Sequence, residues 1–161
     1  MNSPQPLIAA IYNDIKTQFR ASSSGIYIAK PIQEIIRSQS LEGCQDWGTL
    51  WIFMLREEGL PATYIQCVDI DWLNKTQPNQ KISGWSGHVF IQTRIEGDEI
   101  IFDSTGSRRV ECIVRKQDFE IYDEQFVVLF KAVGAMDVGA ETEEGINPLL
   151  QELIKNWHDQ N

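Results

Sequence analysis

The apolar residues of this chain change their spacing about a third of the way along, and that change limits the folds open to it. Before this point they recur every three or four residues, as Leu7, Ile11 and Ile15 do, which predicts amphipathic helices. After it they fill the segment 62–70 and alternate with polar residues over 89–95, which predicts strands. Because helices come first and mostly antiparallel strands follow, we expect the α+β class.

The chain has 161 residues, enough for one domain with a single core. We expect a domain over 1–133, a flexible acidic connector over 134–146 and a C-terminal amphipathic helix over 147–161. The expected helices within the domain are 4–21 (Ser3 as N-cap, Pro4 at the first position), 31–39 and 44–58. The expected strands are 62–70, 89–95, 99–103, 110–115 and 126–131, with a long loop over 71–86.

A short turn fixes the register of two of these strands. Glycine in the second position of a two-residue loop suits a type I′ turn, so we expect the hairpin to turn at Glu96-Gly97. That register places His88 opposite Thr105 and makes Asp103 its diagonal neighbour on one face, roughly 7–8 Å away at the backbone. A turn at Gly97-Asp98 keeps the shared face but increases the offset.

Cys44 stands at the predicted start of a helix, directly after a glycine. The positive end of the helix dipole and the free N–H groups there favour a thiolate, which is the nucleophilic form. Cys67 and Cys112 fall within apolar segments and are expected to be structural. Three cysteines with no paired spacing do not indicate a disulfide framework, so we expect a reducing, cytoplasmic compartment.

These residues together predict a nucleophile, a base and an orienting acid. A carboxylate at Asp103 on one nitrogen of His88 would fix its tautomer and support its charged form. The other nitrogen would then be free to take the proton of Cys44. No single residue of the three is informative alone; the prediction comes from their combination.

The region 29–106 resembles the transglutaminase-like core, a circularly rearranged relative of papain-type cysteine peptidases. The matching residues, in the order of that family, are Cys44, Asp46, Gly59-Leu60-Pro61-Ala62, His88 and, 15 residues later, Asp103. The resemblance implies a nucleophile at a helix N-terminus packed on a mostly antiparallel sheet. It also implies a Cys-His-Asp triad that forms an acyl-enzyme.

The remaining parts of such a site are less defined by the sequence. The backbone N–H of Cys44 is expected to be one donor of an oxyanion hole. The candidates for a second donor are Gln39, Gln33 and Trp85. Trp85 and Trp47 could line a substrate groove, whereas Trp51 is expected in the core.

We therefore predict a cysteine-dependent enzyme that cleaves an amide bond of a peptide or protein through a thioester. The alternatives are transglutaminase-type acyl transfer to an amine and a non-catalytic peptide- or protein-binding module on the same fold. The net charge of −9 makes nucleic acid and anionic membranes poor partners. No apolar run is long enough for a membrane span. The N-terminus does not resemble a secretory signal. No metal or organic cofactor is implied, and the sequence leaves the oligomeric state open.

Overall fold

A computed structural model describes residues 5–23 and 27–161. The helices are α1 (Pro6–Gln18), α2 (Ile32–Ser38), α3 (Gly43–Glu57), α4 (Ile70–Lys75) and α5 (Glu143–Gln160), with a short 3-10 helix, η1 (Ala135–Val138). The strands are β1 (Arg20–Ser22), β2 (Ser40–Glu42), β3 (Ala62–Asp69), β4 (Gly87–Ile95), β5 (Asp98–Asp103), β6 (Ile113–Lys116), β7 (Phe119–Tyr122) and β8 (Phe126–Ala132). The expected α+β class is confirmed.

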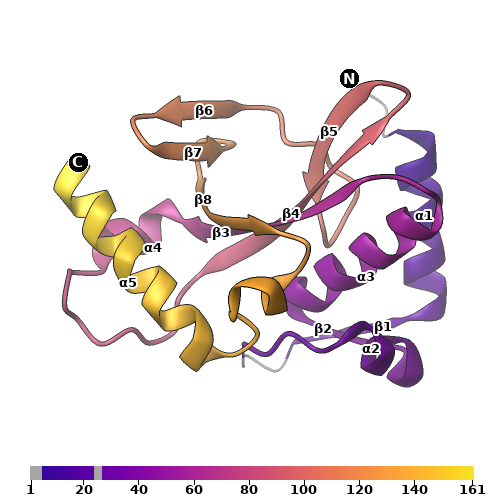
Figure 1. The fold of residues 1–161 in the computed structure, drawn as a ribbon, viewed down its shortest axis with the longest axis horizontal. Coiled ribbons are helices and arrows are strands. Elements are labelled where there is room, and N and C mark those ends of the chain that lie inside the picture. The colour runs from indigo at the N-terminus through magenta and orange to yellow at the C-terminus, as the bar shows by residue number, and fades with distance from the viewer. Residues whose placement is uncertain (1–4, 24–26) are drawn as a thin grey trace.

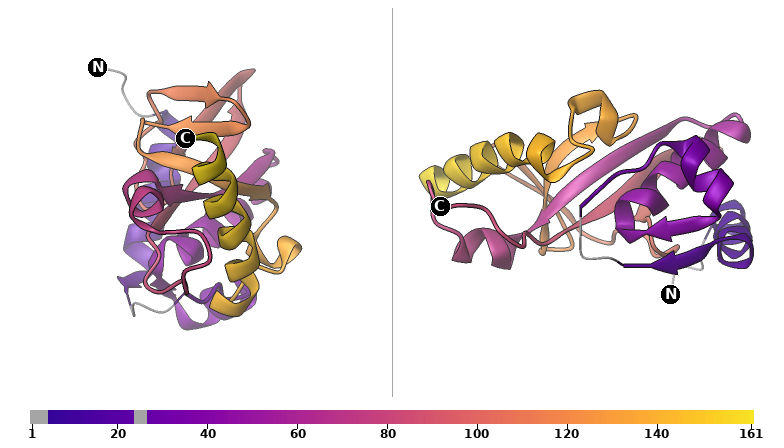
Figure 2. Two further views of the ribbon diagram at one scale, coloured as in Figure 1. Left: turned by 90° about the vertical axis from the view of Figure 1, so that its left-hand side faces the viewer. Right: turned by 90° about the horizontal axis from the view of Figure 1, so that it is seen from below.

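The main sheet has six strands in the order β5-β4-β3-β8-β7-β6, and its neighbouring strands run antiparallel. Helices α1, α2 and α3 gather at the end formed by β3, β4 and β5, while α4 and α5 lie at the other end (Figures 1 and 2). Two buried clusters follow this division, one under the N-terminal helices and one under α5. A third small cluster, which includes Cys67 of β3 and Phe90 of β4, lies on the opposite face of the sheet.

Helix α3 carries the apolar stripe that the sequence predicted. Leu50, Trp51 and Leu55 are fully or almost fully buried, and the chain leaves the helix through Gly59 at a φ of +75°. At Gly48 the helix lies so close to the sheet that an added Cβ would come within 2.6 Å of Val89 Cγ1 and 2.7 Å of a Tyr64 ring carbon. The absence of a side chain at this position therefore sets how closely α3 approaches β3 and β4.

Gly48→Ala is expected to destabilise the protein by about 1–3 kcal/mol, the usual cost of overpacking a close contact. The new methyl group would push α3 away from the sheet, because a tyrosine ring and a valine on a strand have little room to yield. Urea unfolding followed by tryptophan fluorescence measures this cost. A variant with a free energy of unfolding equal to that of the wild type would show that the contact is not tight in solution.

The first helix is shorter than expected. It spans Pro6–Gln18 rather than 4–21, and the side chain of Gln5 caps it by accepting a 3.0 Å hydrogen bond from the N–H of Ile8. It ends early because Arg20–Ser22 pairs in parallel with Ser40–Glu42, a contact between distant segments that local spacing does not reveal. The predicted cap, Ser3, and Pro4 lie outside the described residues.

Two further elements differ from the expected ones. The stretch 71–86, predicted as a loop, contains most of α4, whose N-cap Asp69 accepts a 2.8 Å hydrogen bond from the N–H of Asp71. The strand predicted over 110–115 is β6, which starts later, and β7 between β6 and β8 was not predicted.

The segment 134–146, predicted as a connector, contains η1 and the first turn of α5, which begins at Glu143 rather than at 147. Ala135, Ala140 and Ile146 are buried there. The segment also makes backbone contact with the N-terminal half, because the N–H of Ala29 donates to the carbonyl of Glu141 at 2.8 Å.

Candidate active site

Cys44 is the second residue of α3 and is half-buried. The preceding Gly43 has a φ of +74°, and a Cβ there would come within 2.7 Å of the Gln45 amide oxygen, so the position requires glycine. The first N–H groups of a helix have no partner within the helix. Cys44 thus stands at the start of a helix, as the sequence predicted, and the availability of the N–H groups there to the sulfur stays a prediction.

A buried carboxylate fixes this end of the helix. Asp46 has no exposed surface, and its oxygens accept from the N–H of Glu42 at 2.8 Å and from the N–H of Lys30 at 3.3 Å. The Lys30 ammonium lies 3.2 Å from the same carboxylate. Burial raises the pKa of Asp46, although these hydrogen bonds and the charge of Lys30 oppose the rise. Asp46 therefore joins the start of α3 to two separate segments.

The hairpin that carries the other two residues turns as predicted. Ile95 pairs with Asp98 across a loop of Glu96 and Gly97, both at positive φ. His88 and Asp103 therefore lie diagonally on one face. His88 Nε2 lies 2.5 Å from Asp103 Oδ1, which also accepts from the N–H and the hydroxyl of Thr105, each at 2.9 Å.

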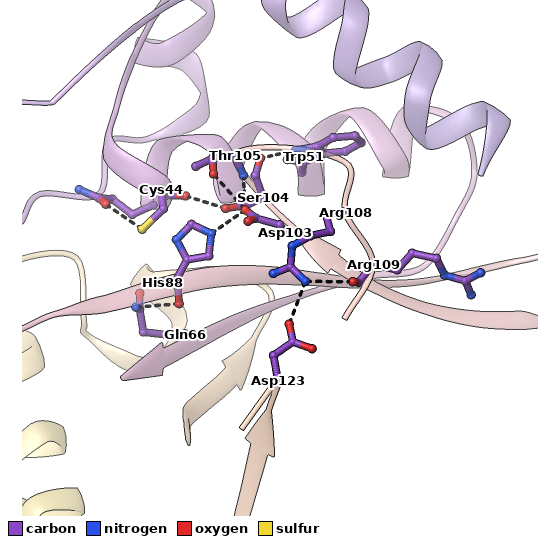
Figure 3. A network of polar contacts seen from close by, with 11 residues as sticks. Cys44, Trp51, Gln66, His88, Asp103, Ser104, Thr105, Arg108, Arg109 and Asp123 are labelled. Carbon is purple, nitrogen blue, oxygen red and sulfur yellow. Dashed lines mark hydrogen bonds and ion pairs between the residues drawn. The ribbon is translucent and has the colours of Figure 1, made fainter. Parts of the chain in front are cut away.

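The imidazole ring of His88 lies between Cys44 and Asp103 (Figure 3). Its Nε2 faces the carboxylate, and its other nitrogen is on the side of the Cys44 sulfur. The ring packs edge-on against Phe90 and at a tilt against Phe126, with centroid distances of 5.2 and 5.9 Å. These contacts hold the ring in the orientation that brings the three groups together.

The charges of this group support one another. Burial disfavours the charged form of His88, but the hydrogen bonds and charges of Asp103 and Cys44 outweigh it and raise the pKa of His88 to about 9. Burial also opposes ionisation of Asp103, yet its hydrogen bond and charge interaction with His88 lower the pKa of that carboxyl. At neutral pH an imidazolium therefore faces a carboxylate.

The free energy of unfolding should depend on pH through the pair of His88 and Asp103. The pKa of His88 is higher in the folded protein than its ordinary value of 6.5, so its contribution is complete below about pH 6.5 and is lost as pH rises through about 9. The contribution of Asp103 is present above its ordinary pKa of about 3.9 and is lost as pH falls through its lowered value. We expect urea titrations to show a lower free energy of unfolding at about pH 9.5 than at about pH 6.5. His88→Gln should remove most of that difference; an unchanged difference would place its origin elsewhere.

Ser104 connects the end of β5 with α3. Its carbonyl accepts a 2.7 Å hydrogen bond from the indole N–H of Trp51, and its hydroxyl donates to the carbonyl of Cys44 at 3.4 Å (Figure 3). Both Ser104 and Trp51 have no exposed surface. Trp51 is therefore a core residue, as expected, and it also fixes the residue beside Asp103 to the helix of Cys44.

A cleft of about 380 Å³ opens above these groups. Cys44, His88 and Thr105 line it together with Tyr27 and Trp85. Trp85 is half-buried and packs against Tyr27 with ring centroids 5.3 Å apart. Trp85 is thus a cleft residue, as the sequence predicted, whereas its role as an oxyanion donor stays a prediction.

The other aromatic and glutamine candidates lie elsewhere. Gln39 ends α2 in the left-handed conformation, with φ at +52°, and does not line the cleft. Gln33 lines a different hollow, between α2, α3 and η1. Trp47 is buried against Tyr12 in the core rather than in a groove. Neither Gln33 nor Gln39 lines the cleft of Cys44, which their proximity in sequence did not indicate.

Two other glutamines line the cleft, and the sequence reading missed both. The Gln45 side chain donates to the carbonyl of Ile28 at 3.2 Å, and its oxygen lies 3.8 Å from the Cys44 sulfur. The Gln66 amide donates to the carbonyl of His88 at 3.3 Å and is almost fully buried. A glutamine in the middle of the apolar strand 62–70 is a signal that could have identified Gln66.

The other two cysteines lie in different surroundings. Cys67 is fully buried, which raises the pKa of its thiol, and Cys112 is half-buried near β6. Within residues 5–23 and 27–161, no group of three or more His, Cys, Asp and Glu side chains is arranged to hold a metal ion. None of the helices described is long and apolar enough to cross a membrane.

No family model and no curated protein matches this chain. Among solved structures, its fold is similar to that of a putative cysteine protease from Cytophaga hutchinsonii, with a TM-score of 0.51 and 20% sequence identity. The match covers 83% of this chain but 38% of that chain, so the present sequence spans well under half the length of its structural neighbour. At this identity the similarity shows that the two chains share an α+β fold.

Proposed function

We propose that this chain is a cysteine-dependent enzyme of the transglutaminase-like type that cleaves an amide bond of a peptide or protein through a thioester. The observation that carries the proposal is the position of the His88 ring, which has Asp103 on one nitrogen and the Cys44 sulfur on the side of the other. The cleft that opens over these groups and the cysteine-protease-like fold also support it.

In the proposed reaction, the proton of the Cys44 thiol resides on His88, and the thiolate attacks the carbonyl carbon of the amide. The negative charge that develops on the carbonyl oxygen is stabilised by the free N–H groups at the start of α3. His88 then donates its proton to the departing amine, which leaves a thioester on Cys44. A water molecule, deprotonated by His88, attacks the thioester and releases the acid. Asp103 stays ionised throughout and orients the ring.

The test uses denatured casein as a general acyl donor and follows three products. New N-termini indicate a peptidase, released ammonia a deamidase, and incorporation of a fluorescent primary amine a transamidase. We expect one of the three for the wild type and none for Cys44→Ala, which removes only the sulfur.

A labelling experiment tests the reactivity of Cys44 even if casein is not a substrate of the protein. Iodoacetamide near neutral pH should alkylate Cys44 in preference to Cys67 and Cys112, and the preference should vanish in the unfolded protein. Absence of all three products together with equal labelling of the three thiols would overturn the proposal in favour of a binding module.

The turnover of the proposed enzyme should have an alkaline limit near pH 9. His88 must be protonated to donate to the leaving amine. Burial lowers the pKa of His88, but Asp103 and Cys44 outweigh burial and raise the pKa to about 9. A plot of kcat/KM against pH should therefore fall above about pH 9. In Asp103→Asn the limit should move to lower pH, because the charge that supports the imidazolium is lost. A limit at the same pH in both proteins would show that His88 does not set it.

A further inference from the structure

The charged residues that line the cleft are unevenly distributed. Besides His88, two carboxylates line it: Glu42, at the end of β2, and Glu143, at the start of α5. Among the described residues that line it, none is a lysine or an arginine. The two carboxylates come from distant parts of the chain, so their presence in one cleft results from the fold rather than from a local run of acidic sequence.

Neither carboxylate forms an ion pair with another of the described residues. The ion pairs within the described residues involve Asp46, Asp103, Asp123 and Glu120. Lys30 contacts this end of α3, but its ammonium is engaged by Asp46 and by the carbonyl of Ser40. Glu42 and Glu143 therefore give the lining of the cleft two acidic residues that no described ion pair offsets.

An acidic residue at a helix start is favourable by itself, and both glutamates stand at helix starts. At α3, however, Glu42 stands two residues before Cys44 and lines the same cleft, so its charge would disfavour the negative charge that develops on the carbonyl oxygen in the proposed reaction. A positive group on the substrate would remove that penalty when it binds. The same cleft has aromatic walls, Tyr27 and Trp85, whose ring faces attract cations.

We propose that this cleft selects amide substrates that carry a lysine or arginine side chain close to the reacting carbonyl. Glu143 and Glu42 bind the cationic group, and the ring faces of Tyr27 and Trp85 contact its aliphatic stem. The net charge of −9 also attracts such substrates toward the protein from solution. This inference rests on the proposed function, since it concerns the specificity of the same cleft.

The first test measures charge selectivity at Cys44 without requiring the natural substrate. Cationic aminoethyl, neutral methyl and anionic sulfonatoethyl methanethiosulfonate are reacted with the folded protein, and the sites are quantified by peptide mapping. For Cys44, the rate with the cationic reagent is divided by the rate with the anionic reagent, and this ratio is normalised to its value in the unfolded protein. The normalised ratio should be about 10 or more at low salt. It should decrease toward 1 in 1 M NaCl, where the Debye length is about 3 Å.

Substitutions identify the charges responsible. Glu143→Gln and Glu42→Gln should each lower the ratio about 3-fold, and the double variant should lower it further. Glu57→Gln makes the same change in net charge at the exposed far end of α3 and should leave the ratio unchanged. A normalised ratio near 1, or equal effects of all three substitutions, would overturn the inference.

The second test uses peptides of one sequence with Lys, Gln or Glu beside the reacting residue. We expect kcat/KM to be highest for Lys and lowest for Glu, and Glu143→Gln to reduce that difference. Equal kcat/KM values for the three peptides, or a higher value for Glu than for Lys, would overturn the proposed selectivity. Turnover of the peptides would still support the proposed function. Failure of the proposed function has a different signature: Cys44 would react with neutral methyl methanethiosulfonate no faster than Cys112.

Discussion

Replacing His88 by alanine is expected to reduce turnover by about 10²–10⁴-fold, the range that a positioned acid–base group contributes. The thiol of Cys44 loses the group that accepts its proton, and the leaving amine loses the group that protonates it. Alkylation of Cys44 by iodoacetamide should slow in parallel, since only the thiolate reacts. Both rates are measured on the same preparation, with Cys67 as the internal reference for a buried thiol.

The second histidine supplies a matched control. His158 lies on α5, where its Nε2 contacts the carbonyls of Leu73 and Thr76 at 3.0 and 2.7 Å. His158→Ala should be less stable because these contacts at the end of α4 are lost, but the folded fraction should retain full turnover. His88→Gln guards against a packing defect, because its side chain still fills space beside Phe90. Full turnover in either His88 variant would contradict the proposed mechanism.

The parts of the site that could be predicted from the sequence depend on local geometry. A two-residue loop with glycine in second place fixes the hairpin register, and the alternation of side chains along a strand then places His88 and Asp103 on one face. The start of α3 is equally local, because Gly43 provides the left-handed conformation directly before Cys44. Together these two local signals account for all three residues of the proposed triad.

The remaining parts depend on contacts between distant segments. Gln45 lies in the cleft because its amide reaches the carbonyl of Ile28, and Gln66 does so because β3 pairs with β4. Glu143 lines the same cleft because residues 28 and 142 pair as a bridge. No periodicity within one segment indicates such pairings, which is why the sequence suggested Gln39 and Gln33, upstream of Cys44, rather than Gln45 and Gln66.

The same reasoning explains how α3 and the hairpin are held together. Sequence patterns predict each element but not the contact between Trp51 and Ser104, which joins α3 to the residue after Asp103. The hydroxyl of Ser104 adds a second link, to the carbonyl of Cys44. The distance between nucleophile and base is thus set by buried tertiary hydrogen bonds rather than by the elements themselves.

Asp103→Asn should preserve the fold and lower turnover by about 10²–10⁴-fold. An asparagine has nearly the same shape, but the imidazole and both donors of Thr105 contact a single carboxylate oxygen, Oδ1. With its amide oxygen in that position the asparagine keeps these contacts but carries no charge. With its NH₂ there it loses the bonds from Thr105 and donates to His88 Nε2, which places the imidazole proton on the nitrogen that faces Cys44. That tautomer cannot accept the thiol proton, and the neutral amide no longer supports the imidazolium.

Two further variants distinguish the orientation of the His88 ring by Asp103 from a general loss of protein stability. Thr105→Val removes one 2.9 Å hydrogen bond to Asp103 Oδ1 but keeps the carboxylate, so its turnover should fall by less than about 10-fold. Asp123→Asn changes a carboxylate that pairs with Arg108 outside the cleft, and its kcat/KM should match that of the wild type. A graded loss in the order Asp103→Asn, Thr105→Val, Asp123→Asn follows only if the carboxylate acts through His88. If Asp103→Asn retained wild-type turnover and the wild-type pH limit, another group would have to orient the ring, and the proposed triad would reduce to Cys44 and His88.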